Sequence, residues 1–200
     1  MNESKQHIIR KSLALFLQKS YKEVTMKDIV EKTGLSKGAF YHYFGSKEEL
    51  FKEIANMVFS MGTIDYDSFG QKSLFEFYNE YLEHISISFQ RIADLFGKPK
   101  EVSLSFNIFL IIFEAISRFP EFLALELDLY NRELKAWEKT VSSARLSGEI
   151  KSQSSDRQIA ELFLYCNDGV FIRFINNNKS TSYEEDLRSA FNTIYTNLKA

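Results

Sequence analysis

The chain has 200 residues, with 25 Lys and Arg against 27 Asp and Glu, so its formal net charge of −2 does not by itself indicate a nucleic-acid-binding protein. Its single cysteine, Cys166, excludes an internal disulfide and favours a reducing compartment. No apolar run reaches the roughly 18 residues of a membrane span, and the opening Met-Asn-Glu-Ser-Lys is not a signal peptide. We therefore expect a cytoplasmic protein with no membrane partner.

An all-α fold follows from the residue usage. Only two prolines interrupt the chain, Phe occurs 19 times, and alternating β-type patterns are rare. The pattern predicts about nine helices around an apolar core. The first spans about residues 4–19, with an apolar face formed by Ile8, Ile9, Leu13, Phe16 and Leu17.

Residues 25–50 predict two very short helices followed closely by a third. Thr25 is placed to cap the first helix, and Gly34 ends it where a left-handed backbone is needed. Ser36 caps a second helix over about residues 37–43, and Ser46 with Glu49 forms a capping box for a helix over 46–60. Two helices around a short glycine-containing turn indicate a helix-turn-helix, whose second helix enters the DNA major groove.

The remainder of the chain predicts a second, larger helical domain. Gly62–Gly70 breaks the helical period and indicates a connection, so we divide the chain into domains 1–62 and 63–200. The first carries a net charge of +3 and the second −5, as expected for a DNA-binding head on an acidic body. The further helices are predicted over about residues 71–96, 101–118, 121–146, 155–176 and 183–198. Helix 101–118 is apolar on most sides, which predicts that it is buried.

The second short helix supplies the candidate DNA-reading residues. Lys37, Gly38 and Ala39 occupy its first turn, where side chains meet base edges: Lys37 can donate to guanine, Ala39 can touch a thymine methyl, and Gly38 permits close approach. Neighbouring positions cannot all face inward. We therefore expect Phe40 and Phe44 in the core, and Tyr41 and His42 outside, either as phosphate donors or simply solvated.

The same stretch resembles the signature of the TetR family of bacterial transcriptional regulators. The resemblance rests on Ile29-Val30, Gly34-Leu35-Ser36, Gly38, Phe40-Tyr41, Tyr43-Phe44, Lys47 and Leu50. It implies contacts to the DNA backbone from Thr25, Lys27, Tyr41, His42 and Lys47. Lys47 and the free amides behind Ser46 would then form a phosphate site at a helix N-terminus.

The resemblance also implies a homodimer and a small-molecule effector. The last two helices, within about 155–198, would pair across a two-fold axis, with Gly169 allowing close approach. An apolar, aromatic pocket would be formed by Phe106, Phe113, Tyr130, Trp137 and Tyr165, with Asn107, Glu114 and Arg118 as polar anchors. The alternatives are that these rings are only core and that Glu114 and Arg118 form a surface ion pair.

No catalytic or metal-binding constellation is visible, because His7, His42 and His84 lack ligand partners at helical spacing and Cys166 lies in a strongly apolar helix. We therefore predict a DNA-binding regulator that is not an enzyme and needs no cofactor. The expected function is a repressor on double-stranded operator DNA, associated with the nucleoid when bound, and released by an apolar or aromatic effector. The alternatives are an activator, an effector-independent regulator, or a helical interaction protein that does not bind DNA.

Overall fold

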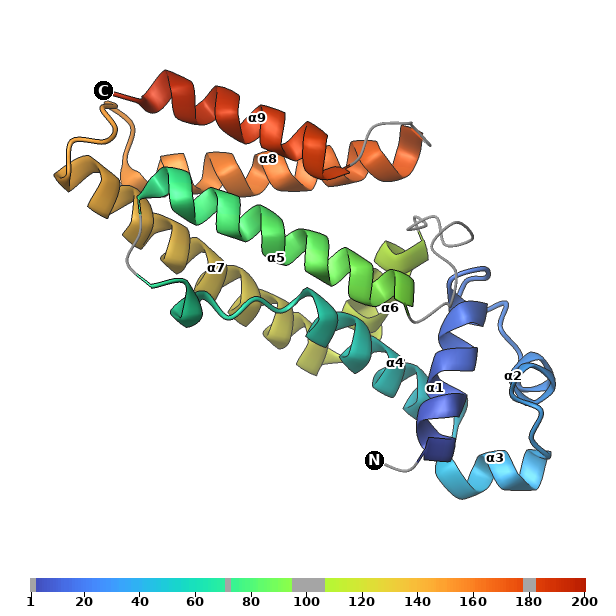
Figure 1. Ribbon diagram of the computed structural model, residues 1–200. Coiled ribbons are helices and arrows are strands. Elements are labelled where there is room, and N and C mark those ends of the chain that lie inside the picture. The colour runs from blue at the N-terminus through green and yellow to red at the C-terminus, as the bar shows by residue number, and fades with distance from the viewer. Residues whose placement is uncertain (1–2, 71–72, 95–106, 178–182) are drawn as a thin grey trace. The chain divides into compact units, whose positions relative to one another are not determined.

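A computed structural model describes residues 3–70, 73–94, 107–177 and 183–200. Within these ranges the chain forms nine α-helices and one 3-10 helix and no β-strand, which confirms the predicted all-α fold (Figure 1). In the same ranges, no helix combines the length and the apolar character that crossing a lipid bilayer requires.

The chain folds into two compact units. The first comprises residues 1–62 and 91–124, and the second comprises residues 63–90 and 125–200. One border of the units lies after residue 62, where the sequence also placed its domain boundary. The grouping of residues 91–124 with the N-terminal head is a feature that the sequence pattern did not predict.

The first unit is built on four N-terminal helices with a shared aromatic core. They are α1 (Glu3–Phe16), α2 (Met26–Thr33), α3 (Lys37–Tyr43) and α4 (Lys47–Gly62). Phe16, Tyr21 and Phe51 pack together, with the Phe51 ring edge-on to both neighbours at 5.2 and 4.8 Å between centroids. Edge-to-face pairs of this kind stabilise a core beyond simple burial, so the small head has a well-defined interior.

Helix α6 (Asn107–Arg118) and the start of α7 (Pro120–Leu146) pack against α4 in this unit. Phe59 of α4 stacks on Phe122 at 5.3 Å between ring centroids, and Lys52 pairs with Glu121 at 2.7 Å. Pro120 occupies the first position of α7, where its missing N–H leaves no hydrogen bond unmade. The head therefore includes more of the chain than residues 1–62, which the sequence predicted for it.

The expectation that helix 101–118 is buried on all sides is wrong for the part that the structure describes. Ile111 and Ala115 of α6 are buried, but Phe113 is 61% exposed within the single chain. The reason is that α6 packs through one face only, with an opposite face that includes Phe113 and part of Leu110 left open. Residues 101–106 of the predicted helix lie outside the described residues.

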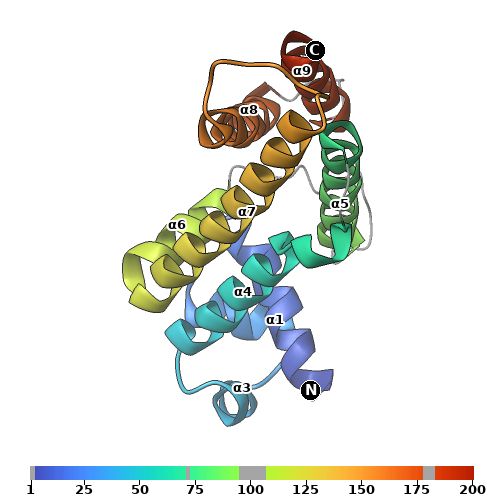
Figure 2. The same cartoon turned by 90° about the vertical axis from the view of Figure 1, so that its left-hand side faces the viewer.

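The second unit consists of a short 3-10 helix η1 (Tyr66–Phe69), α5 (Leu74–Asp94) up to residue 90, most of α7, α8 (Asp156–Asn177) and α9 (Tyr183–Leu198). Trp137 is at its centre and is fully buried, stacking on Phe163 at 4.8 Å and meeting Phe77 edge-on at 4.9 Å. Helices α8 and α9 lie side by side (Figure 2). Four buried phenylalanines, Phe69, Phe77, Phe163 and Phe191, belong to the core of this unit.

Candidate nucleic-acid interface

The first helix of the helix-turn-helix is held at both ends by its own sequence. The Thr25 hydroxyl accepts a hydrogen bond from the Asp28 N–H at 3.1 Å, and the Asp28 carboxylate accepts one from the Thr25 N–H at 2.8 Å. The hydrogen bonds that Thr25 donates lower the pKa of Asp28 to about 2. Gly34 ends the helix with φ 71°, a left-handed conformation that favours glycine. Both sequence expectations for α2 are confirmed.

The turn that begins at Gly34 leads directly into α3. Ser36 has an extended backbone, and its hydroxyl accepts a hydrogen bond from the Ala39 N–H at 3.1 Å, so the predicted cap is present. The short helix then ends at Tyr43, with the Phe44 N–H donating to the Phe40 carbonyl at 3.1 Å. Because α3 has only seven residues, it depends on this cap and on its buried rings for its position.

Helix α3 separates a buried face from an exposed one. Phe40 and Phe44 are fully buried, as expected, and their rings lie 5.7 Å apart. Lys37, Gly38, Tyr41 and His42 are exposed, and Ala39 is half-buried. No atom lies within 4 Å of the position that a Gly38 side chain would occupy. The candidate base-reading turn is therefore exposed to solvent.

Thr25 and Lys27 are also exposed, at the start of α2. The Thr25 side chain already serves the capping box. Its hydroxyl also donates to Asp28 at 2.6 Å, so the proton that was expected to meet a phosphate is engaged in the free protein. Lys27 lies close by with its side chain in solvent.

The structure gives Lys47 a role inside the head. Its ammonium donates to the carbonyls of Tyr21 and Val24, both at 2.8 Å, and lies 4.2 Å from the centre of the Tyr21 ring. Burial, followed by the nearby charge of Arg118, lowers the pKa of this lysine. Because two of its three N–H donors are used on these carbonyls, we propose that Lys47 holds the Tyr21–Val24 segment, in place of the phosphate contact expected from the sequence.

The N-terminus of α4 is occupied by the carboxylate of Glu49, a residue of the same helix. Ser46 caps the helix by accepting from the Glu49 N–H at 3.1 Å, and the Glu49 carboxylate accepts from the Gly45 N–H at 2.7 Å. The expected capping box is thus present with one difference. The Glu49 carboxylate accepts from the N–H of Gly45 and not from the N–H of the capping residue Ser46. A carboxylate at this position competes with a phosphate for the helix N-terminus.

Two residues predicted for a ligand pocket belong to the head instead. The Arg118 guanidinium lies 4.2 Å from the centre of the Tyr21 ring, and its Nε donates to Glu114 at 2.5 Å. Tyr21 thus contacts two cations, Lys47 and Arg118. No local sequence signal points to this arrangement, because residues nearly a hundred positions apart form it.

The other predicted pocket residues are divided between the units. Phe113 is exposed in the first unit, whereas Tyr130, Trp137 and Tyr165 belong to the second. Trp137 is core, while Tyr165 is exposed and hydrogen-bonds with Tyr130, which raises the pKa of Tyr130. Asn107 is the first residue of α6, and Phe106 lies outside the described residues. The ligand role of these residues stays a prediction.

A capped helix, a glycine turn and a second helix with an exposed first turn define a DNA-binding helix-turn-helix regulator. The family model described as "Bacterial regulatory proteins, tetR family" matches residues 8–54. The head of this chain is therefore similar to the DNA-binding domain of that family, and the protein is a DNA-binding transcriptional regulator. Members of this family act as regulators of transcription and are not enzymes.

The relatives extend the likeness beyond the head. The chain is 25% identical over 164 residues to the HTH-type transcriptional regulator YfiR of Bacillus subtilis, an alignment covering 82% of this chain and 76% of that protein. It is 48% identical over 50 residues to YerO of the same organism, which covers 25% of this chain and only 17% of that protein.

The solved structures support the same fold. The ketosteroid transcriptional regulator KstR2 of Mycobacterium tuberculosis superimposes with a TM-score of 0.65 at 15% identity, covering 100% of this chain and 97% of that one. A TetR-family regulator from Agrobacterium tumefaciens gives a TM-score of 0.65 at 14% identity, covering 98% of each chain. At such identities the likeness establishes the fold of the chain and does not extend to its ligand.

Proposed function

We propose that this protein is a repressor that binds a palindromic operator as a homodimer in the bacterial cytoplasm and that a small molecule bound by its second unit releases it. The main support for DNA binding is that the first turn of α3 is exposed while Phe40 and Phe44 anchor the helix in the core. Lys37, Gly38 and Ala39 read base edges, while Lys27, Tyr41 and His42 contact the sugar-phosphate backbone. Thr25 caps the helix that carries Lys27. The repressor direction is supported by relatives such as KstR2, which is named as a repressor.

The need for two copies comes from the size of α3. One seven-residue helix contacts few base pairs, so useful specificity requires two half-sites. The surface that supports dimerisation is on α8, where Leu162, Tyr165 and Ile172 are about half exposed. Gly169 lies on the same helix, and no atom lies within 4 Å of the position that an added methyl group would occupy there, so a partner helix has room to approach closely.

Helix α9 contributes less to this surface than the sequence pattern predicts. Leu187, Phe191 and Leu198 are buried in the core of their own unit. These side chains pack the second unit itself and leave the exposed face of α8 as the main dimer contact. The proposed interface still falls within residues 155–198.

The proposed effector is an apolar or aromatic molecule bound within the region of residues 71–175. Aromatic side chains are plentiful in the second unit, and Tyr130 and Tyr165 lie partly or largely outside its core. Ligand binding changes DNA affinity only as far as the ligand discriminates between the DNA-bound and free states of the dimer.

A mobility-shift titration on the DNA upstream of the protein's own gene tests the operator. We expect a shifted complex at nanomolar protein, and a footprint with two protected half-sites about one helical turn apart, roughly 34–36 Å, or a multiple of that spacing. A scrambled duplex of the same composition is the control. Equal affinity for both duplexes would contradict sequence-specific recognition.

A further inference from the structure

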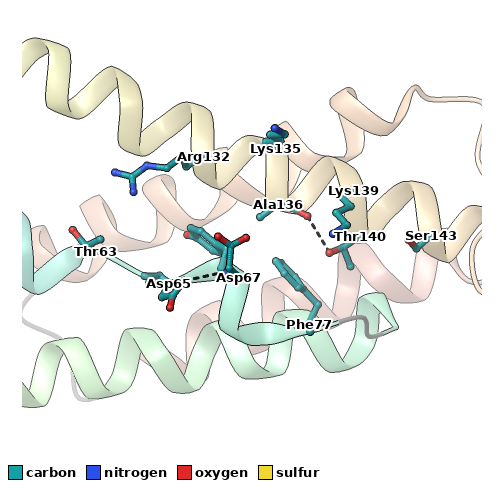
Figure 3. A pocket seen from close by; sticks show the side chains of 13 residues that line it. Thr63, Asp65, Asp67, Phe77, Arg132, Lys135, Ala136, Lys139, Thr140 and Ser143 are labelled. Atoms are coloured by element: carbon teal, nitrogen blue, oxygen red, sulfur yellow. Dashed lines mark hydrogen bonds between the residues drawn. The ribbon is translucent and has the colours of Figure 1, made fainter.

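The second unit contains a pocket of about 570 Å³ between the segment that precedes α5 and one face of α7 (Figure 3). This volume is within the range of small-molecule sites, roughly 300–1,000 Å³. None of the eight ligand residues predicted from the sequence lines it. Its lining combines apolar, hydroxyl and charged side chains, namely Thr63, Ile64, Asp65, Tyr66, Asp67, Gly70, Phe77, Arg132, Lys135, Ala136, Lys139, Thr140 and Ser143.

Three cations of α7 belong to this lining. Arg132, Lys135 and Lys139 follow one another at spacings of three and four residues, which places them along one side of the helix. Arg132 pairs with the exposed Asp128 of its own helix, at 2.8 Å, and a surface pair of this kind is weak. Lys139 forms no ion pair within the described residues, and the Thr140 and Ser143 hydroxyls lie beside it in the lining.

The opposite side of the pocket combines a fixed aromatic ring with two carboxylates. The Tyr66 ring stacks near Phe77 at 6.5 Å between centroids, and its hydroxyl donates to Glu133 at 2.9 Å, so the ring is fixed from behind. Asp65 and Asp67 also line the pocket. Asp65 caps η1 by accepting from the Asp67 N–H at 3.2 Å. Because these two carboxylates repel an anion near η1, a bound acid group belongs on the α7 side.

We infer that this pocket binds an aromatic or alicyclic carboxylate, with its acid group on the α7 side, where Arg132 and Lys139 line the pocket, and its ring against Tyr66. The guanidinium and ammonium supply charge-assisted hydrogen bonds to the acid, and the hydroxyls of Thr140 and Ser143 supply further donors. The inference rests on the proposed effector function and departs from its description above in two respects. The effector carries an acidic group, and it is bound by the segment that directly follows α4.

The test uses two probes of the same shape that differ in charge, 1-naphthoate and 1-naphthamide, in isothermal titration calorimetry on the full-length protein. We expect saturable binding of one naphthoate per chain and at least roughly tenfold weaker binding of the amide. The double variant R132Q/K139Q is expected to bind naphthoate about tenfold more weakly than the wild type and to bind the amide as the wild type does. The control variant K151Q/K199Q removes two exposed lysines of the same unit outside the pocket and is expected to bind naphthoate like the wild type.

Three results would overturn the inference: no saturable naphthoate binding by the wild type, equal binding of the two probes, or an R132Q/K139Q variant that binds naphthoate as the control variant does. Operator binding is measured on the same samples without probe. A protein that binds its operator but not naphthoate would refute the carboxylate site and leave the proposed repressor function standing. If the wild type does not bind its operator, the proposed repressor function is refuted instead.

Discussion

At the scale of single residues, the charged groups of the head divide into those that hold it together and those left for DNA. Lys47 and Arg118 contact Tyr21, and Asp28 closes a capping box with Thr25. Lys27 and Lys37 are exposed, and neither forms an ion pair within the described residues. The sequence cannot separate these two groups of cations, because each looks like a lysine or arginine near a helix end.

Replacement of Lys47 by alanine tests its structural assignment. Two carbonyl oxygens, those of Tyr21 and Val24, would lose their donor, so we expect the head to lose about 1–3 kcal/mol of stability. Urea denaturation followed by circular dichroism measures the loss, with Lys27→Ala as the exposed control. The salt dependence of DNA binding should keep its slope in Lys47→Ala; a slope reduced by about one would show that the lysine contacts a phosphate after all.

The capping box predicts a specific acid sensitivity. Because hydrogen bonds from Thr25 lower the pKa of Asp28 to about 2, its carboxylate stabilises the fold at all pH values above its unfolded pKa, near 4. That contribution is lost as the pH falls from about 4 towards 2. Melting temperatures of wild type and Asp28→Ala should therefore differ at pH 6 and converge near pH 2; a constant difference would mean that the carboxylate is not what matters.

At the scale of elements, two glycines of the helix-turn-helix have opposite roles. Gly34 has φ 71°, whereas Gly38 lies in a helical conformation within α3, and neither has an atom within 4 Å of an added methyl group. Gly34→Ala should therefore destabilise the head by about 1–2 kcal/mol through backbone strain alone. Gly38→Ala should stabilise it by up to about 1 kcal/mol.

For Gly38→Ala, the effect on DNA binding should be opposite to the effect on stability. Gly38→Ala adds a methyl group where the backbone meets the major groove, so we expect weaker operator binding by a protein that is more stable. Thermal unfolding and fluorescence anisotropy on the same samples separate the two effects. Operator affinity unchanged in Gly38→Ala would show that α3 does not approach the bases at this position.

The helix-turn-helix could be predicted from the sequence because its signals are local. Thr25, Gly34 and Ser36 act on amides and carbonyls within four residues, and the structure has each of them in the expected role. The position of α6 could not be predicted this way. Its apolar residues indicate burial in general, whereas contacts between distant residues, such as Arg118 with Tyr21 and Phe122 with Phe59, show that this part of the chain joins the head.

The pocket of the second unit was also missed by sequence reasoning. Aromatic residues drew attention, but Trp137 proved to be core, and the pocket is lined by cations of α7. A usable signal was present in the spacing of Arg132, Lys135 and Lys139 along one side of a helix. Nothing in the sequence placed the Thr63–Gly70 segment opposite them.

At the scale of the whole molecule, binding to a palindromic operator requires a dimer, which we place on α8. Ile172→Glu and Gly169→Leu should each weaken association at least roughly tenfold, because a charge or a bulky side chain then enters an apolar contact between helices. Leu146→Glu is the matched control, since Leu146 is 86% exposed at the end of α7. Sedimentation velocity across the micromolar range measures the effect, and a wild-type monomer in that range would refute the proposed interface.

The most direct test of base reading by α3 is a base-by-base substitution scan of the operator half-site, measured by fluorescence anisotropy for wild type and Lys37→Ala. If Lys37 reads a base edge, the variant loses about 1–3 kcal/mol of discrimination at one position per half-site and keeps the preferences of the wild type elsewhere. Lys151→Ala, in the second unit, serves as the control for a lost positive charge. A uniform loss of affinity across all sequences, specific and random, would contradict base reading by the first turn of α3.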